Sequence, residues 1–372
     1  MNLSPARAGL AGPLVPAGGP SGAEVALLRG LVAVPSPSGE ERPAADWLLA
    51  RLGEMGVAAH LDQVGNVIAA VDPTAGSGAS QGPIYLLGHI DTVAGFWEPR
   101  ESGGTLWGRG SSDAKGPLCA FVAAAVRARE SRRLRRRVLI LGAVEEETTS
   151  RGARHLAASL PPPAFLVVGE PSGSGRVVVG YMGSLRCRLE VSRGVAHTSG
   201  PHPTAAELAI ETWSSVRRLV DRLNSGRRGF GAVQLHLLGF DTVSDGLMET
   251  AALNLSFRLP VGLPCQQMLL HLRRLHPRAS WRADGGEDAV VVPRRGPLPA
   301  AFAQAIRAAG GDPGWQHRLA TSDLNVVMPT WRCPAVVYGP GDSRSDHTPA
   351  EAITLSDYGR AIGVLTSVLG SL

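Results

Sequence analysis

The chain has 372 residues, a formal net charge of +5 and 44% hydrophobic residues. This balance is typical of a soluble globular protein that is large enough for two domains, and it excludes disordered and fibrous classes. No uninterrupted apolar stretch approaches the roughly 20 residues that a membrane helix needs, so we expect no membrane span.

Residues 1–22 are rich in proline and glycine, and they lack the continuous apolar segment of a secretory signal. We therefore expect a disordered leader on a cytoplasmic protein. The cysteines are widely spaced and form no CxxC pair, which favours buried free thiols over disulfides or a thiolate zinc site. They are Cys119, Cys187, Cys265 and Cys333.

The positive charge is almost entirely arginine, because Lys115 is the only lysine, and several arginines cluster between residues 127 and 137. One interpretation of this cluster is the solvated end of a helix. The other is a docking surface for an acidic protein, since positive potential speeds encounter with anionic surfaces. Nucleic acid is a weaker candidate, because we recognise no DNA-binding or RNA-binding module.

The first half of the chain has the pattern of an α/β domain. Helical periodicity predicts helices over residues 23–34 and 43–56. A further helix is predicted over 114–130, between the first two of three short apolar runs that are typical of buried strands. These runs are 84–91, 136–144 and 164–171. Alternating strands and helices indicate a sheet that is at least partly parallel.

After residue 177 the pattern changes to alternating strands and amphipathic helices, which predicts a compact α+β insert over 178–293. Its predicted strands are 183–192, 232–243 and 251–261, and its predicted helices are 204–224 and 265–276. The first pattern then returns, with a helix over 298–310 and a buried strand near 335. The predicted plan is one α/β domain, 23–177 and 294–372, interrupted by a smaller one.

Each of the three buried runs ends at potential metal ligands. His89 and Asp91 end the first, the triplet Glu145–Glu147 directly follows the second, and Glu170 lies at the end of the third. The carboxyl ends of strands in an open α/β sheet are where function collects, so these groups are expected to converge. Asp113 in a glycine-rich loop and His347 near the C-terminus complete the candidates.

Two imidazoles and several carboxylates suit a pair of borderline divalent ions such as zinc, cobalt or manganese. Two such ions lower the pKa of bound water and so supply a nucleophile near neutral pH. The alternative interpretation of the glutamate triplet alone is a strand that ends in solvent. The joint occurrence of the other ligand types favours the metal site.

The motifs GHIDTV, GRGSSDAKG, EEETTSRGA, GEP and SDHTPAE resemble the M20 metallopeptidase family, from about residue 24 to the end. These motifs are most similar to those of the branch that hydrolyses amino-group carrier protein conjugates of lysine and ornithine. The resemblance implies a zinc-exopeptidase-like catalytic domain with an inserted α+β lid and dimerisation domain.

The resemblance also implies five metal ligands, two for each ion and one that bridges both: His89 and Glu170, Glu147 and His347, and Asp113. Glu146 would be the general base. Asp91 would orient His89, because residues i and i+2 of a strand face the same way. Glu145 stands where the family usually has Asp, so it falls outside the ligand set, unless the register shifts by one and makes it the base.

Three further residues are implied in the insert and after it. His197 would reach the active site of a partner subunit and stabilise the oxyanion, although Ala196 replaces a more usual glycine before it. Arg258 would bind the substrate carboxylate. Asp323 would meet a cationic group of the substrate. The segment 180–185 would form the hinge of the lid.

The resemblance therefore predicts a homodimeric amidohydrolase with two divalent ions, Zn²⁺ or Co²⁺. Its substrate would be an acidic amino-group carrier protein bearing lysine or ornithine on its C-terminal glutamate, in lysine or arginine biosynthesis. One alternative is a deacylase of small substrates, such as N-acetylornithine or succinyl-diaminopimelate, or a dipeptidase. A metal-binding scaffold without catalysis is the alternative of another class.

Overall fold

A computed structural model describes residues 19–74, 82–276 and 279–372. The predicted leader lies outside these ranges up to residue 18. Its last residues belong to a helix, since Ser21 caps α1 (Gly22–Val32) by accepting a hydrogen bond from the amide of Glu24. Within the described ranges, no helix is both long and apolar enough to cross a membrane.

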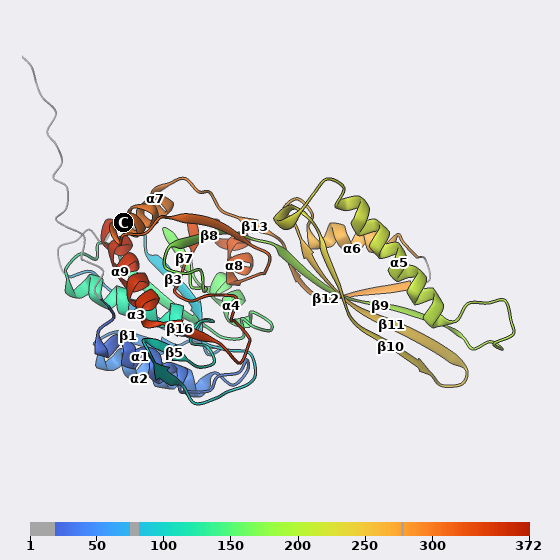
Figure 1. Cartoon of the computed structure of the whole chain (residues 1–372), viewed down its shortest axis with the longest axis horizontal. Helices are drawn as coiled ribbons and strands as arrows, with labels where there is room; N and C mark the ends of the chain where they lie inside the picture. Colours follow the sequence, from blue (N-terminus) through green and yellow to red (C-terminus); the bar gives the residue numbers. More distant parts are fainter. Residues whose placement is uncertain (1–18, 75–81, 277–278) are drawn as a thin grey trace, which may run out of the picture.

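A nine-stranded sheet forms the centre of the larger domain (Figure 1). Its order is β1-β2-β6-β3-β7-β15-β8-β13, with β14 also paired to β8. The strands are β1 (Ala58–Leu61), β2 (Val67–Val71), β3 (Ile84–His89), β6 (Val138–Ala143), β7 (Phe165–Val168), β8 (Arg176–Tyr181), β13 (Val290–Val291), β14 (Gly314–Arg318) and β15 (Ala335–Val337). Neighbours among β6, β3, β7 and β15 are parallel, which explains their continuous apolar runs.

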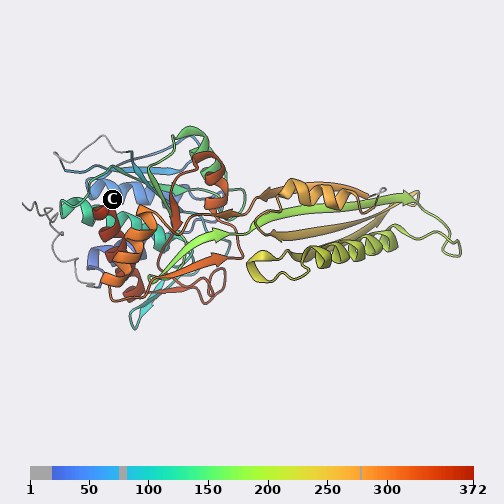
Figure 2. The ribbon, with the colours of Figure 1, turned by 90° about the horizontal axis from the view of Figure 1, so that it is seen from above.

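Helices cover both faces of this sheet (Figure 2). The connection from β3 to β6 runs one way across the sheet and the connection from β6 to β7 runs back, so right-handed crossovers put their helices on opposite faces. One layer contains α1, α2 (Arg42–Glu54), α3 (Lys115–Glu130), α7 (Pro297–Ala308) and α9 (Leu355–Ser371). The other contains α4 (Arg151–Ser159) and α8 (Asp323–Trp331), which contact each other.

The only lysine ties two helices of the first layer together. Lys115 opens α3 and is 1% exposed, and its ammonium donates hydrogen bonds to the carbonyls of Val34 at 2.6 Å and Leu31 at 3.3 Å. Burial lowers the pKa of this amine to about 8.

A three-stranded sheet holds two loops beside the carboxyl ends of β3 and β6. It contains β4 (Arg100–Ser102), β5 (Thr105–Trp107) and β16 (Ala352–Thr354), in the order β16-β5-β4. The loop that carries Asp113 follows β5, and the loop that carries His347 precedes β16. The pairing of β5 with β16 therefore brings these two residues together from opposite ends of the chain.

A second sheet with its own core forms a smaller domain that extends away from the first (Figures 1 and 2). We call residues 183–287 the insert. Its strands are β9 (Gly183–Gly194), β10 (Gln234–Ser244), β11 (Met248–Leu259) and β12 (Ala279–Glu287), in the order β10-β11-β9-β12. The helices α5 (Ala205–Leu223) and α6 (Cys265–Arg273) cover one face, and a short 3₁₀ turn (Gly229–Gly231) follows α5.

Two chain segments cross side by side between the domains. The chain leaves the large sheet at Met182 and returns at Asp288, and the amide of Asn325 donates to the carbonyls of both, at 3.1 and 2.8 Å. Glycine is required at position 183, because a Cβ there would lie 2.6 Å from the carbonyl oxygen of Glu287. The predicted limits of 178 and 293 lie a few residues outside this crossing, the first within β8 and the second just after β13 of the large sheet.

Candidate active site

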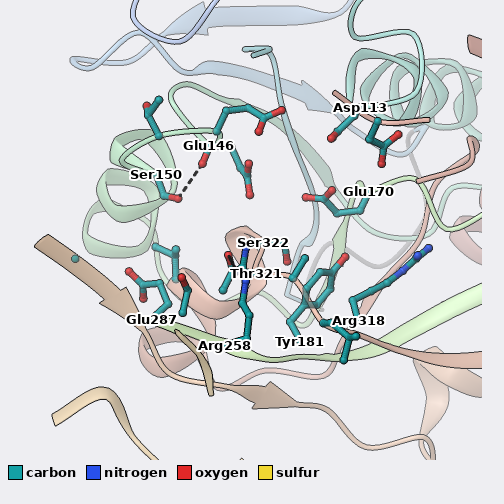
Figure 3. A pocket seen from close by; sticks show the side chains of 18 of the residues that line it. Asp113, Glu146, Ser150, Glu170, Tyr181, Arg258, Glu287, Arg318, Thr321 and Ser322 are labelled. Atoms are coloured by element: carbon teal, nitrogen blue, oxygen red, sulfur yellow. Dashed lines mark hydrogen bonds between the residues drawn. The ribbon is translucent and has the colours of Figure 1, made fainter. Parts of the chain in front are cut away.

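A cavity of about 960 Å³ lies between the carboxyl edge of the large sheet and the insert. Figure 3 shows the carboxylates of Asp113, Glu146 and Glu170 on one side and the guanidinium groups of Arg258 and Arg318 on the other. The acidic lining residues are Asp113, Glu146, Glu147, Glu170, Asp284, Glu287 and Asp346. The basic lining residues are Arg154, Arg186, Arg258 and Arg318, and His317 and His347 also line the cavity.

Asp113 lies between two imidazoles. One of its carboxylate oxygens is 3.2 Å from Nε2 of His89, and the other is 3.1 Å from Nε2 of His347. Glu147 is 3.0 Å from the same nitrogen of His347. A carboxylate that presents one oxygen to each of two ligand groups has the geometry of a bridging ligand.

The electrostatics of this cluster are strongly perturbed. Hydrogen bonds from its imidazole to the carboxylates of Asp113 and Glu147 raise the pKa of His347 to about 10. Burial alone would raise the pKa of Asp113, but its hydrogen bonds with His347 and His89 outweigh burial and hold that pKa below its usual range. The imidazole of His347 occupies a position where a bound cation would also offset the negative charge of these carboxylates.

Two half-buried carboxylates, Glu146 and Glu170, face the cluster, and no ion pair within the described ranges includes either of them. Burial and the charge of Glu146 and Asp113 raise the pKa of Glu170 well above its usual value. Burial also raises the pKa of Glu146, and nearby Asp323, Glu147 and Asp113 raise it further.

The donor set fits divalent metal. His89, Asp113 and Glu147 each offer a ligand atom, and these atoms lie within 4.8 Å of one another. Imidazole nitrogens with carboxylate oxygens are the ligands that zinc and similar ions take in catalytic sites. Glu170 and His347 line the same cavity, so all five predicted ligands come together.

Asp91 is fully buried and accepts hydrogen bonds from three sides. Its backbone carbonyl is 3.0 Å from Nδ1 of His89. Its carboxylate accepts from the amides of Glu146 at 3.0 Å and Glu147 at 3.1 Å, and from the hydroxyl of Ser38 at 2.7 Å. Asp91 therefore fixes His89 and also the backbone of both glutamates, which the sequence did not predict.

The backbone conformation at Glu145 separates its side chain from those of Glu146 and Glu147. Glu145 has φ of +58°, and its carbonyl accepts from the amides of Thr149 and Ser150. Its carboxylate points to Arg151, 2.7 Å away, and to the hydroxyl of Thr149, which together lower its pKa. Glu146 and Glu147 line the cavity, whereas Glu145 does not.

Glu351 supports the loop that carries Asp113. It is fully buried, and one oxygen accepts from the amides of Ser112 and Asp113, both at 3.1 Å. The other oxygen accepts from Arg109 at 2.7 Å. Glu351 ends the motif SDHTPAE, so the sequence contained a signal for this residue, although its partner lies 238 positions away.

Residues 85–371 match peptidase family M20/M25/M40. This match covers more than half of the chain and contains His89, Asp113, Glu147, Glu170 and His347. The chain belongs to this family.

Curated relatives align with almost the whole M20 chain. The LysW-lysine hydrolase of Deinococcus radiodurans is 38% identical over 93% of this chain and 96% of its own length. The LysW-lysine/LysW-ornithine hydrolase of Sulfurisphaera tokodaii is 27% identical over 89% of this chain and 90% of its own.

A solved M20 metallo-carboxypeptidase from Sulfolobus solfataricus shares the fold of the M20 chain. It has a TM-score of 0.74 at 19% identity, and the alignment covers 94% of this chain and 98% of that one. The α/β domain with its inserted α+β domain, predicted from the sequence, is therefore confirmed as an M20 fold.

The remaining predicted site residues of the M20 chain lie in three different places. Arg258 lines the cavity and donates a hydrogen bond to Thr321 at 3.2 Å. Asp323 is 2% exposed and does not line the cavity. His197 follows β9, in the connection to α5 at the end of the insert farthest from the large sheet (Figure 1), so the cavity of its own chain does not contain it.

Several residues of the cavity were not predicted. Arg318 donates to the hydroxyl of Ser343 at 2.5 Å and to the carbonyl of Pro171 at 2.9 Å. Tyr181 lies beside it (Figure 3), and burial and then Glu170 raise the pKa of its phenol well above its usual value. Arg186 alternates with buried residues on β9, a pattern that marks a solvent face but gives no sign of a cavity.

Loss of the Ser38 hydroxyl should weaken metal binding. Ser38→Ala removes a hydrogen bond from the carboxylate that fixes both His89 and the glutamate loop, and such supporting contacts are worth about 10-fold to 100-fold in metal affinity. Competition with a chromophoric chelator measures this. Ser36→Ala is the matched control, because its hydroxyl donates to the carbonyl of Ile90 in the same loop. Equal affinity in both variants would exclude a special role for Ser38.

Metal binding should compete with protons. His347 has a pKa raised to about 10, so it is protonated near neutral pH and must lose its proton before its nitrogen binds an ion. The metal affinity should therefore rise between pH 7 and 9, by about tenfold per pH unit for each proton displaced. Chelator competition at pH 7, 8 and 9 tests the slope, and a flat profile would contradict it.

Proposed function

We propose that this M20 chain releases lysine, ornithine or both from the C-terminal glutamate of an amino-group carrier protein of the LysW type. The observation that carries the proposal is the near full-length alignment with relatives named for this reaction. The bond broken would be a linear amide between the glutamate side chain and the released amino acid. The reaction would belong to cytoplasmic lysine or arginine biosynthesis.

The charges of the cavity support a substrate with carboxylates next to the broken bond. Acids from the edge of the large sheet line the cavity together with Arg186, Arg258 and Arg318. A lysine attached through its amino group to a glutamate side chain has one free carboxylate on each side of the amide. Guanidinium groups bind carboxylates through paired hydrogen bonds, so we assign Arg258 to one of them.

Two divalent ions, Zn²⁺ or Co²⁺, are part of the proposal. When bound, they would polarise the amide carbonyl and lower the pKa of the attacking water. His89 and Glu170 would hold one ion, Glu147 and His347 the other, and Asp113 both. Glu146 would take the proton of the water and deliver it to the leaving amine.

We also propose a homodimer formed through the insert. The strand β10 lies at the edge of its sheet, so one row of its backbone groups has no partner strand within the described chain. Exposed apolar side chains surround this edge: Leu237, Leu238, Phe240, Val243, Leu247 and Met248. A second copy paired along β10 would cover them and bring in a second His197.

The imidazole of His197 can donate a hydrogen bond through Nε2. Its Nδ1 accepts from the amide of Ser199 at 3.2 Å, so the neutral ring carries its proton on Nε2. That proton would stabilise the oxyanion in the site of the partner subunit. Asp323 retains its proposed role toward a cationic substrate group only if its buried carboxylate becomes accessible on substrate binding.

The substrate is tested by comparing two classes of amide, carrier conjugates and small substrates. The metal-loaded enzyme should hydrolyse carrier conjugates of lysine or ornithine far faster than N-acetylornithine, succinyl-diaminopimelate or dipeptides. Release of free amino acid is measured in each case. Equal or faster turnover of a small substrate would replace the carrier proposal by a small-substrate deacylase or dipeptidase. If the metal-loaded protein hydrolysed none of these amides, the non-catalytic metal-binding scaffold would replace both enzyme proposals.

A further inference from the structure

The chain has four tyrosines, and the side chains of all four are buried. They are Tyr85, Tyr181, Tyr338 and Tyr358. A phenol that is buried with the rest of its ring loses the hydrogen bonds of water, so its hydroxyl usually donates to an acceptor within the protein. The acceptor of each hydroxyl therefore shows what the fold uses that side chain for.

Three of the four hydroxyls donate to backbone carbonyls of distant segments. The donor and acceptor pairs are Tyr85 with Pro161 at 3.1 Å, Tyr338 with Ser174 at 2.9 Å, and Tyr358 with Glu24 at 3.2 Å. None of these three tyrosines lines the cavity. Their hydroxyls are fully explained as contacts that hold the large domain together.

Tyr181 differs from the other three tyrosines in both respects. Its hydroxyl has no hydrogen-bond partner among the residues that the structure describes, and its side chain lines the cavity. The side chain is nevertheless 4% exposed and belongs to the core of the large domain. Tyr181 is the last residue of β8, where Arg318 of β14 and Val290 of β13 flank it in the strand register. The unpaired hydroxyl is thus held in place at the cavity wall.

This hydroxyl lies next to the groups that would carry out the reaction. Figure 3 shows it on the side of the ring that faces Glu170. Burial raises the pKa of the phenol most, and Glu170 has the largest effect among the charged groups. Glu146 and Asp113 raise this pKa as well. The phenol is therefore close to two predicted metal ligands and to the predicted general base.

The surroundings of the hydroxyl favour one kind of acceptor. A buried phenol is neutral at pH 7, so it can donate one hydrogen bond without bringing a charge. A carboxylate of the substrate would be repelled by Glu170 at this place. The carbonyl oxygen of an amide is neutral when the substrate binds and becomes negative only when water attacks. A donor that is already in place for this oxygen stabilises the transition state more than the bound substrate.

We propose that Tyr181 is a catalytic residue that donates a hydrogen bond to the carbonyl oxygen of the scissile amide and stabilises the negative charge that develops there. The phenol keeps its proton throughout, because Glu146 carries out the proton transfer. The inference rests on the proposed function in one respect only, that the bond broken is an amide. Tyr181 would act on the site of its own chain, whereas His197 would act on that of the partner subunit.

The test removes this hydroxyl and keeps the ring. In Tyr181→Phe, kcat for the carrier conjugate should fall by about 10²-fold or more, which is the usual loss for one oxyanion donor. The KM should stay within about threefold, because the contact is made only in the transition state. The melting temperature should not fall, since the hydroxyl makes no hydrogen bond in the free protein.

Tyr85→Phe is the matched control, because it removes a buried hydroxyl that already has an acceptor. Tyr85 lies near the amino end of β3, whereas His89 ends that strand at the cavity. The control should lower the melting temperature by about 2 °C and leave kcat and KM unchanged. The two variants should therefore have opposite effects on stability and on turnover.

Two binding measurements separate a catalytic role from a supporting one. A phosphinate analogue of the γ-glutamyl amide carries the tetrahedral geometry and the negative oxygen. Its dissociation constant should rise in Tyr181→Phe by about the factor that kcat/KM loses, while that of free lysine stays unchanged. Metal affinity, measured by competition with a chromophoric chelator, should also stay unchanged.

Other results would overturn the proposal. A raised KM at unchanged kcat would assign the hydroxyl to a substrate group that is bound equally in the ground state. Weaker metal binding in Tyr181→Phe would make the hydroxyl a support for Glu170. Unchanged kinetics together with unchanged binding of the phosphinate would leave the hydroxyl without a role in the reaction.

Failure of this proposal and failure of the proposed function give different results. If the unchanged protein hydrolysed a small amide but not the carrier conjugate, the function would be overturned, and the same comparison on that amide would decide the role of Tyr181. If Tyr181→Phe hydrolysed the conjugate at the unchanged rate, the function would stand without Tyr181. If the unchanged protein hydrolysed no amide, both would be overturned.

Discussion

Glu146→Gln should lower turnover by about 10²-fold to 10⁴-fold while the protein keeps its metal. The amide of glutamine preserves the size and the hydrogen-bonding shape of the side chain but cannot accept a proton from water, and proton transfer contributes about this much to catalysis. Turnover and metal content are measured on the same preparation. Glu146 is only partly buried and lies near Asp113, and the substitution removes one acid from an acidic cluster, so no large change in folding is expected.

Glu145→Gln is the matched control, one residue away in the same triplet. It breaks an exposed pair with Arg151 and a hydrogen bond to Thr149, so activity should change by less than about a factor of three. If Glu145→Gln abolished turnover and Glu146→Gln did not, the base would be Glu145 and the register of the triplet would be wrong.

His197→Ala should abolish turnover although His197 lies far from the cavity of its own chain. The sharper experiment mixes this variant with Glu146→Gln after reversible dissociation. Each parent is inactive, but a mixed dimer has one site with an intact Glu146 and a His197 from its partner. Random exchange gives half mixed dimers with one working site each, so about a quarter of the full activity should return.

The mixing experiment excludes the competing explanations directly. If His197→Ala alone kept full activity, this histidine would be an ordinary surface residue. If mixed dimers formed but stayed inactive, His197 would not act across subunits. Sedimentation of differently tagged variants confirms that exchange took place.

The sequence predicted the parts of the site that depend on local pattern. The apolar runs before His89, Glu145 and Glu170 are strands that are buried on both faces, and their carboxyl ends meet because they are parallel neighbours. The helices over 204–224 and 265–276 were predicted from their periodicity and lie within three residues of the observed ends. Such features are determined by residues close to one another in the chain.

The sequence did not predict the contacts that hold those parts in place. The hydrogen bond from Ser38 to Asp91 joins residues 53 positions apart, and that from Arg109 to Glu351 joins residues 242 positions apart. No periodicity connects such pairs, so only the folded chain identifies them. The helices α4, α8 and α9 were also missed. Both α4 and α8 are only nine residues long and α8 contains Pro329, while Gly359, Gly363 and Gly370 interrupt the pattern of α9.

Because the ammonium group of Lys115 is buried, amine-reactive reagents should label the folded protein only weakly. Apart from the amino terminus, no primary amine exists elsewhere in the sequence, and this one is 1% exposed and bonded to two carbonyls. Each hydrolysis of a carrier amide would create a new α-amino group. A fluorogenic amine label added to quenched reactions should therefore report product against almost no signal from folded enzyme, and arginine carries the surface charge without interfering.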